Sequence, residues 1–300
     1  MLHLLNGDAT LSVFPPALPG DRVVWRDIMV EGPAVGEGAA RAAWLAPRLG
    51  ITRDDYERRW RDGQAVLART AVEDEVILWF EQDLFCAVNL WFVASTLPAT
   101  TPVWLVFPPV TDTWRGLGTL APQDLADLFQ HRRPFDADAR AEAGALWRAY
   151  AASEPTALAR LVPTLDFARD AVRLHLGRFP STARGIDEIE TTTLATLAHG
   201  ARAFTELFRA VTHAPAHRRH GMGDVQYAAV LRDLGPLIAI EGADAPFADW
   251  RVALSRDGAA VLDGRLDGLV ARTLDRWLGG VHLRPDAPGW RWDGSRVVRD

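Results

Sequence analysis

The chain of 300 residues contains no lysine, so all 33 of its basic side chains are arginines. Schiff-base catalysis needs a lysine, and so do the phosphate-binding loop of nucleotide hydrolases and the ATP site of protein kinases. The absence of this residue therefore excludes all three mechanisms. The abundance of Ala, Gly, Pro and Arg indicates a GC-rich coding sequence.

Cysteine is nearly absent too. Cys86 stands alone in the apolar segment LFCAVNLWF, so no disulfide can form within the chain. We expect a small buried side chain there rather than a reactive thiol. No apolar stretch approaches the roughly 20 residues that cross a bilayer, and the start MLHLLNGD lacks the basic leader of a signal peptide. The sequence therefore predicts a cytoplasmic protein without a membrane partner.

The remaining composition is that of a globular protein, with 48% apolar and 24% charged residues and a net charge of −6. This length favours two domains. An acidic chain needs a concentrated basic patch to bind nucleic acid. Twelve tryptophans are many for this length, and Trp290 and Trp292 alternate like one face of a terminal strand.

Short apolar runs at 2–8, 22–33, 75–83 and 102–109 are typical of buried parallel strands. The segments between them, at 37–50, 52–70, 83–97 and 121–132, have helical composition, with Gly50 as a helix cap. Strands that alternate with helices predict a three-layer, Rossmann-like α/β domain with a parallel sheet. We assign it to residues 1–135.

Residues 136–184 are predicted to form a helical bridge that ends in a linker at 180–185. Residues 185–300 then form a C-terminal domain. Its helices are expected at 186–200, 203–213 and 223–235, the last with Asp224 as N-cap. The segments 236–242 and 250–264 then supply a strand, a loop and a second strand, followed by a short helical turn. Three helices followed by a β-hairpin predict a winged-helix-like fold.

Several motifs together resemble a bacterial family known only as domain of unknown function 1835. They are Gly7-Asp8, Arg26-Asp27, Glu31-Gly32-Pro33, the run from Trp79 to Phe85 with Asn89-Leu90, and near the end Arg276 to Leu283 with Trp290 to Asp293. The resemblance covers about the first 130 residues well and the rest more loosely. It implies a grouping without a mechanism. Relatives commonly continue from Gly-Asp into a Ser, whereas this chain has Ala9-Thr10, which weakens any proposal of a serine nucleophile.

Acidic residues follow three of the predicted strands, and in an open α/β sheet ligands bind in the crevice beyond the carboxyl ends of the strands. We therefore expect five carboxylates to converge there: Asp8, Asp27, Glu31, Glu81 and Asp83. Glu81 and Asp83, with Asp8 as third ligand or general base, are the candidate catalytic and metal-binding residues. A hard cation such as Mg²⁺ would relieve their repulsion and hold a phosphate or polarise a water.

The same residues allow two other interpretations. Asp83 caps the following helix, Asp8 caps its own turn and Glu81 pairs with Arg26, or the crevice is a metal-free pocket for a polar ligand. The candidate ligand-binding residues are Asn6, Arg26 as an anion anchor, Asp27, Glu31 and Asn89. Asn89 either reaches the crevice or satisfies a buried carbonyl.

The first turn, from Asn6 to Thr10, is not a glycine-rich dinucleotide-binding turn and offers an acid where a pyrophosphate would lie, which argues against conventional NAD binding. The segment HAPAHRRHG at 213–221 has histidine spacings typical of metal ligands, but Pro215 interrupts a helix there. We expect a solvated loop.

Two functional hypotheses follow. The first is a cytoplasmic enzyme or binding protein for a small phosphorylated or nucleotide-like ligand at the acidic crevice. The second is a regulatory or adaptor protein that acts through the winged-helix-like domain. That domain has more acidic than basic residues and an acidic wing, and its third helix offers only Gln226 and Arg232 to DNA. This favours contact with protein over DNA.

Overall fold

The structure, a computed structural model of the whole chain, describes residues 1–36, 38–111, 116–286 and 289–300. Its largest sheet has the strand order β2-β1-β3-β4-β5, in which the first four strands are parallel and β5 is antiparallel to β4. The strands are β1 (Leu2–Asn6), β2 (Asp21–Trp25), β3 (Val76–Trp79), β4 (Val103–Val106) and β5 (Arg133–Pro134). The predicted α/β class with a mainly parallel sheet is confirmed.

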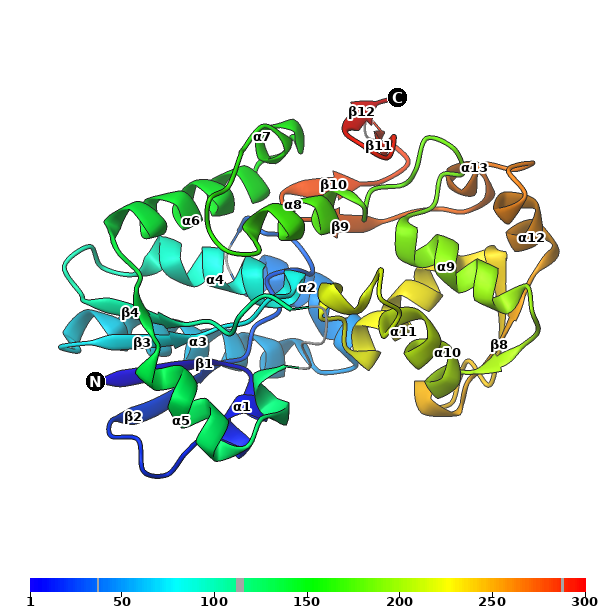
Figure 1. Cartoon of the computed structure of the whole chain (residues 1–300). Helices are drawn as coiled ribbons and strands as arrows, with labels where there is room; N and C mark the ends of the chain where they lie inside the picture. The colour runs from blue at the N-terminus through cyan, green and yellow to red at the C-terminus, as the bar shows by residue number, and fades with distance from the viewer. Residues whose placement is uncertain (37, 112–115, 287–288) are drawn as a thin grey trace.

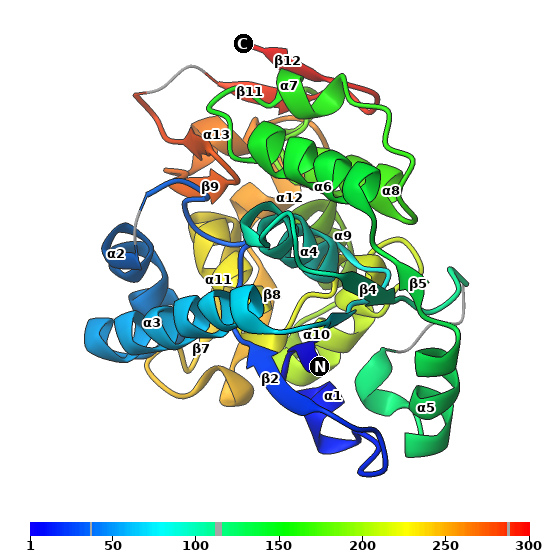
Figure 2. The same cartoon turned by 90° about the vertical axis from the view of Figure 1, so that its left-hand side faces the viewer.

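Buried side chains on both faces explain why these strands are continuously apolar. Leu4 and Leu78 pack into one hydrophobic core, while Leu5 and Ile77 pack into a second core on the opposite face. Figure 2 shows α4 and α6 on one side of the sheet and α5 on the other. The helices of this part are α1 (Asp8–Ser12), α2 (Gly38–Leu49), α3 (Arg53–Arg69), α4 (Leu84–Thr96), α5 (Pro122–Gln130), α6 (Ala137–Tyr150), α7 (Thr156–Ala159) and α8 (Ala168–Leu176), with 3₁₀ turns η1 (Thr70–Val72) and η2 (Leu117–Thr119).

The strand order reverses between β1 and β3. The chain goes from β1 outward to β2 on one side, and from β3 outward to β4 on the other. The two connections therefore diverge beyond the carboxyl ends of β1 and β3, and a crevice is left where they part. Ligands of open α/β sheets bind at such a point.

The second apolar run ends as a strand earlier than predicted, at Trp25 rather than near residue 33. Side chains bind the backbone that follows: Arg41 donates to the carbonyls of Ile28 and Pro33, and the amide of Met29 donates to Asn89. Because side chains satisfy these backbone amides and carbonyls, this segment does not need the hydrogen bonds of a neighbouring strand. Residues 26–33 form a buried loop instead.

A second unit with its own hydrophobic core follows the bridging helices. Leu194, Leu207 and Leu231 are fully buried in this core, and in Figure 1 the unit lies to the right of the sheet. Its small antiparallel sheet has the order β6-β8-β7. Its elements are α9 (Glu188–Leu197), β6 (Arg202–Ala203), α10 (Phe204–Thr212), η3 (Arg218–His220), α11 (Asp224–Leu234), η4 (Gly235–Leu237), β7 (Ile238–Glu241), η5 (Phe247–Asp249), β8 (Arg251–Leu254) and α12 (Arg256–Leu262).

The three predicted helices of this unit are confirmed to within two or three residues. The N-cap of α11 is Gly223, however, and Asp224 is the first helical residue, so the predicted cap is wrong by one position. Among the described residues, we find no helix that combines the length and the apolar character needed to cross a membrane.

The end of the chain returns to the core of the first unit. Leu278 and Trp292 belong to the same buried cluster as Leu4 and Leu78, and so do residues of α6 and α8. Trp292 lies on a terminal strand, as predicted. The elements of this part are α13 (Gly268–Ala271), β9 (Arg276–Leu278), β10 (Val281–Leu283), β11 (Trp290–Trp292) and β12 (Val297–Arg299).

A buried cluster of charged side chains joins the two units at the start of α9. We call it the α9 charge cluster, and it consists of Asp187, Glu190, Asp233, Arg272 and Arg276. Arg272 donates two hydrogen bonds to Glu190, at 2.7 and 2.8 Å, and Arg276 donates to Glu190, Asp187 and Asp233 at 2.7, 2.8 and 3.1 Å. The Glu190 side chain is 0% exposed and the Arg272 side chain 1%. Although burial opposes it, Arg272 and Arg276 lower the pKa of Glu190.

Replacing Glu190 by Gln should destabilise the protein strongly. The substitution keeps the side-chain shape but leaves two buried guanidinium groups without their main counter-charge, which costs about 3–5 kcal/mol of unfolding free energy in comparable sites. Asp263→Asn is the matched control, because it breaks an ion pair with Arg265 in which both side chains are more than half exposed. That change should cost less than about 1 kcal/mol. Urea denaturation measures both values, and equal losses would contradict a structural role for the cluster.

Candidate functional site

A cleft of about 590 Å³ lies at the reversal of strand order, between the carboxyl end of β3 and the connection from α10 to α11. We call it the switch-point cleft. Its floor is formed by Glu81, Gln82 and Asp83, and its roof by Arg218, Arg219 and Gly221. Carboxylates from the first unit thus face guanidinium groups from the second unit across the cleft.

Asp83 caps a helix at this floor, and its carboxyl has a raised pKa. Its Oδ1 accepts a hydrogen bond from the amide of Cys86 at 2.6 Å, so the predicted cap of the following helix is confirmed. Burial raises the pKa of this carboxyl to about 6, against the opposing hydrogen bonds from Cys86.

Glu81 stands two residues before Asp83, and its Oε2 accepts from the amide of Leu117 at 2.9 Å. Gly116, whose φ is +103°, lets the loop approach this carboxylate closely. One ligand atom each from Glu81, Asp83 and Cys86 lies within 4.8 Å of the other two. The Cys86 side chain is buried as predicted, and burial, with Asp83 and Glu81 adding to it, raises the pKa of its thiol.

Two asparagines fix the geometry around this thiol. Asn6 donates to the Sγ of Cys86 at 2.8 Å and accepts from Asn89 at 2.8 Å. Asn89 also donates to the carbonyl of Asp27 and accepts from the amide of Met29. Of the two alternatives for Asn89, the structure shows the one in which it satisfies buried backbone groups. It holds the loop after β2 against α4.

Asp8 and Arg26 form an ion pair away from the cleft floor. The shortest distance between them is 2.7 Å, and their side chains are 61% and 53% exposed. The hydrogen bond from Arg26 lowers the pKa of Asp8. Two predicted contacts are therefore wrong: Asp8 caps no turn, because the cap before α1 is Gly7, and the partner of Arg26 is Asp8 rather than Glu81.

The other two predicted acids lie in the buried loop after β2. Asp27 accepts from Arg41 at 3.2 Å and from the hydroxyl of Tyr56 at 2.8 Å. Glu31 accepts from Arg178 at 2.7 Å and from Gln226 at 3.2 Å, so it bridges the two units. The expectation that all five acidic side chains converge is therefore wrong, and of the five only Glu81 and Asp83 line the cleft.

The roof was missed in the sequence because the segment 213–221 was interpreted as a solvated loop. His217 and His220 are buried, at 5% and 4% exposure, whereas Arg218 and Arg219 line the cleft. In the pattern His-Arg-Arg-His the two imidazoles point inward and the two arginines between them point outward. This pattern could have indicated that the segment packs against the protein rather than lying in solvent.

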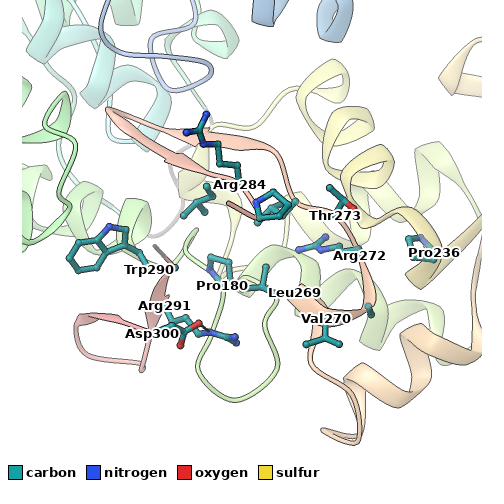
Figure 3. Close-up of a pocket in the computed structure, with 15 residues that line it drawn as sticks. Pro180, Pro236, Leu269, Val270, Arg272, Thr273, Arg284, Trp290, Arg291 and Asp300 are labelled. Atoms are coloured by element: carbon teal, nitrogen blue, oxygen red, sulfur yellow. Dashed lines mark hydrogen bonds and ion pairs between the residues drawn. The ribbon is translucent and has the colours of Figure 1, made fainter. Parts of the chain in front are cut away.

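A larger cavity, of about 690 Å³, lies elsewhere, between α13, the end of β10 and β11. Figure 3 shows Arg291 beside Asp300 at this cavity, with Leu269 and Pro180 close by. Its cations are paired, Arg272 with Glu190, and Arg291 with Asp267 and Asp300. Arg219 of the switch-point cleft is paired too, with Asp170 at 3.2 Å, so pairing does not distinguish the two sites. We favour the smaller cleft because it places titratable groups at the reversal of strand order.

A scan against protein-family models gives no match for this sequence, and a search of curated protein sequences gives none either. The resemblance to the bacterial family rests on the quoted motifs alone.

Closure of the roof onto the floor depends on Gly221, whose φ is +63°. A Cβ at this position would lie 2.7 Å from the Cγ of Asp83. Gly221→Ala should therefore cost more than the roughly 1–2 kcal/mol of a left-handed alanine. The matched control is Gly50→Ala, with a φ of +67° and nothing within 4 Å of the added Cβ. Chemical denaturation of both variants gives the difference; a loss no larger than that of the control would show that roof and floor are not in close contact.

Proposed function

We propose that the switch-point cleft binds a small phosphorylated or nucleotide-like ligand together with a divalent cation. The observation that carries this proposal is the grouping of Glu81, Asp83 and Cys86 within 4.8 Å, on the floor of a cleft whose roof holds Arg218 and Arg219. The carboxylates of the floor would bind the cation, and the arginines of the roof would bind an anionic group of the ligand.

The donor set favours a hard cation at neutral pH. Two carboxylates this close repel one another unless a proton or a cation lies between them. Mg²⁺ and Mn²⁺ bind through one or two carboxylates and keep water or phosphate oxygens as their other ligands. Because the raised pKa of Cys86 keeps its sulfur protonated, the thiol joins the ligand set only for a softer metal such as Zn²⁺, which displaces the proton.

The roof supplies the complementary charge. Guanidinium groups form short, often bidentate hydrogen bonds with phosphate oxygens. A phosphate placed between the cation and Arg218 or Arg219 would contact both walls of the cleft at once. In this proposal Asp8 and Arg26 stay at the surface, and Asn6 and Asn89 hold the floor in position.

We also propose a Rossmann-like fold for the first unit and a winged-helix-like fold for the second. The order β2-β1-β3-β4 of parallel strands supports a Rossmann-like first unit with its ligand at the reversal. In the second unit, the element order α9-β6-α10-α11-β7-β8 with the sheet order β6-β8-β7 supports a winged-helix-like fold. We also retain the relationship to domain of unknown function 1835 as part of the proposal.

The DNA-binding version of the regulatory alternative requires an accessible α11, since the third helix of such a fold enters the major groove. Gln226 of α11 donates to Glu31 of the first unit, and Asp233 faces Arg48 of α2 at 3.8 Å. These contacts turn this helix toward the first unit. They favour a role for the second unit in packing and in covering the cleft over a role in DNA binding.

Titration with MgCl₂, MnCl₂ or ZnCl₂, each alone and with inorganic pyrophosphate, should raise the melting temperature of the protein. A cation at a hundred times its dissociation constant adds about 2.7 kcal/mol of stability. Glu81→Gln and Asp83→Asn should lose this gain, and asparagine preserves the helix cap. Because the pKa of Asp83 is about 6, the affinity for the cation should fall up to about tenfold per pH unit below that value.

The control for these variants is Asp8→Asn, which removes one carboxylate from the exposed ion pair with Arg26 and should keep the full response. Isothermal titration calorimetry measures the affinities. The cation site is contradicted if none of the three metals stabilises the protein, or if Asp83→Asn responds as strongly as the unmodified chain.

A further inference from the structure

The segment that forms the roof of the cleft is anchored by two buried imidazoles. His217 and His220 flank Arg218 and Arg219, and their exposure is 5% and 4%. Neither imidazole lines the cleft. Arg218 and Arg219 therefore line the cleft in a conformation in which both rings lie inside the protein.

Each ring has one satisfied nitrogen and one that is not. The Nε2 of His217 lies 2.7 Å from the hydroxyl of Thr192 on α9, and the Nδ1 of His220 lies 2.9 Å from the carbonyl of His217. The Nδ1 of His217 and the Nε2 of His220 are buried without a hydrogen-bond partner among the described residues. A proton added to either nitrogen would place a charge there with no acceptor.

The charges around the rings are mainly positive. The positive charge of Arg173 on α8 lowers the pKa of both His217 and His220, and that of Arg178, which follows α8, lowers the pKa of His220. Among the described residues, Glu188 on α9 opposes these charges at His217, and it is already paired with Arg173 at 2.9 Å. Asp83, the N-cap of α4, faces Gly221. The two rings also face one another, with centroids 5.6 Å apart, so each protonation disfavours the other.

We propose that residues 217–221 form a pH-sensitive latch, which holds the roof of the switch-point cleft while both imidazoles are neutral and releases it when they are protonated. The latch would regulate the site of the proposed function, but its release is a property of the ligand-free protein. It can therefore fail or succeed independently of cation binding.

The direction of the effect follows from proton linkage. Burial lowers the pKa of His220 to about 3 and also lowers the pKa of His217. In the released segment both return to about 6.5. Below that pH the released form binds protons that the closed form cannot, so acid favours release. Each imidazole should raise the opening constant up to about tenfold per pH unit well below its released pKa, which amounts to about thirtyfold between pH 7.5 and 5.

Hydrogen exchange followed by mass spectrometry on the ligand-free protein tests the latch. Peptides covering residues 217–222 are compared between pH 7.5 and 5, after correction for the intrinsic pH dependence of exchange. We expect their opening constant to rise at least thirtyfold over this range while a peptide covering β3 stays protected. No rise, or an equal rise in β3, would overturn the proposal.

Substitutions assign the effect to the rings. His217→Gln keeps an amide near the position of Nε2 and His220→Asn keeps a donor near Nδ1, so the double variant should hold the roof closed at both pH values. His213→Gln is the control, because this exposed histidine lies in the same connection and does line the cleft. It should leave the pH dependence unchanged.

Arg173→Gln provides a second, independent test that keeps both histidines. It removes the cation that faces both rings and frees Glu188 to act on His217, so release should move to lower pH. A pH dependence that persists in the double variant, or one that Arg173→Gln leaves unmoved, would overturn the latch.

Discussion

The position of the second unit over the sheet depends on the α9 charge cluster. Asp187 and Glu190 belong to the start of α9, whereas Arg276 begins the strand β9, which returns to the first core. Buried charges tolerate little displacement, because a guanidinium moved away from its carboxylates remains desolvated without compensation. The cluster thus fixes the relative position of two separate hydrophobic cores. The shape of the cleft between the units depends on that position.

The switch-point cleft shows how distant segments supply complementary chemistry. The floor comes from the end of β3, where the helix α4 begins and the carboxylate of Asp83 caps its first amides. The roof comes from a 3₁₀ turn more than 130 residues later, held by two imidazoles that satisfy only half of their hydrogen-bonding capacity. Asp83 is held in the floor by a hydrogen bond to the helix that follows it directly in sequence. The roof is held by contacts with distant segments, and in the proposed latch these contacts depend on pH.

Sequence reasoning succeeded where local physics decides structure. Alternating apolar and helical segments located β1, β3, β4 and the helices around them, and Asp83 as a helix cap follows from its place before an apolar helix. It failed for Asp27 and Glu31, since an apolar run does not reveal whether its backbone will be satisfied by a neighbouring strand or by side chains such as Arg41 and Asn89. It also failed for His217 and His220, whose burial requires α8 and α9 to lie beside them.

The sequence by itself determined the α/β class, the two carboxylates at the end of β3, the isolation of Cys86 and the absence of every lysine-dependent mechanism, because each depends on composition or on short-range pattern. Only the tertiary structure decided which acids share a site, that Asp8 is paired with Arg26, and that arginines from the second unit face Glu81 and Asp83. These facts depend on how strands are ordered and how two cores are joined. Strand order and the joining of cores are set by long-range packing, which a linear pattern does not encode in any local window.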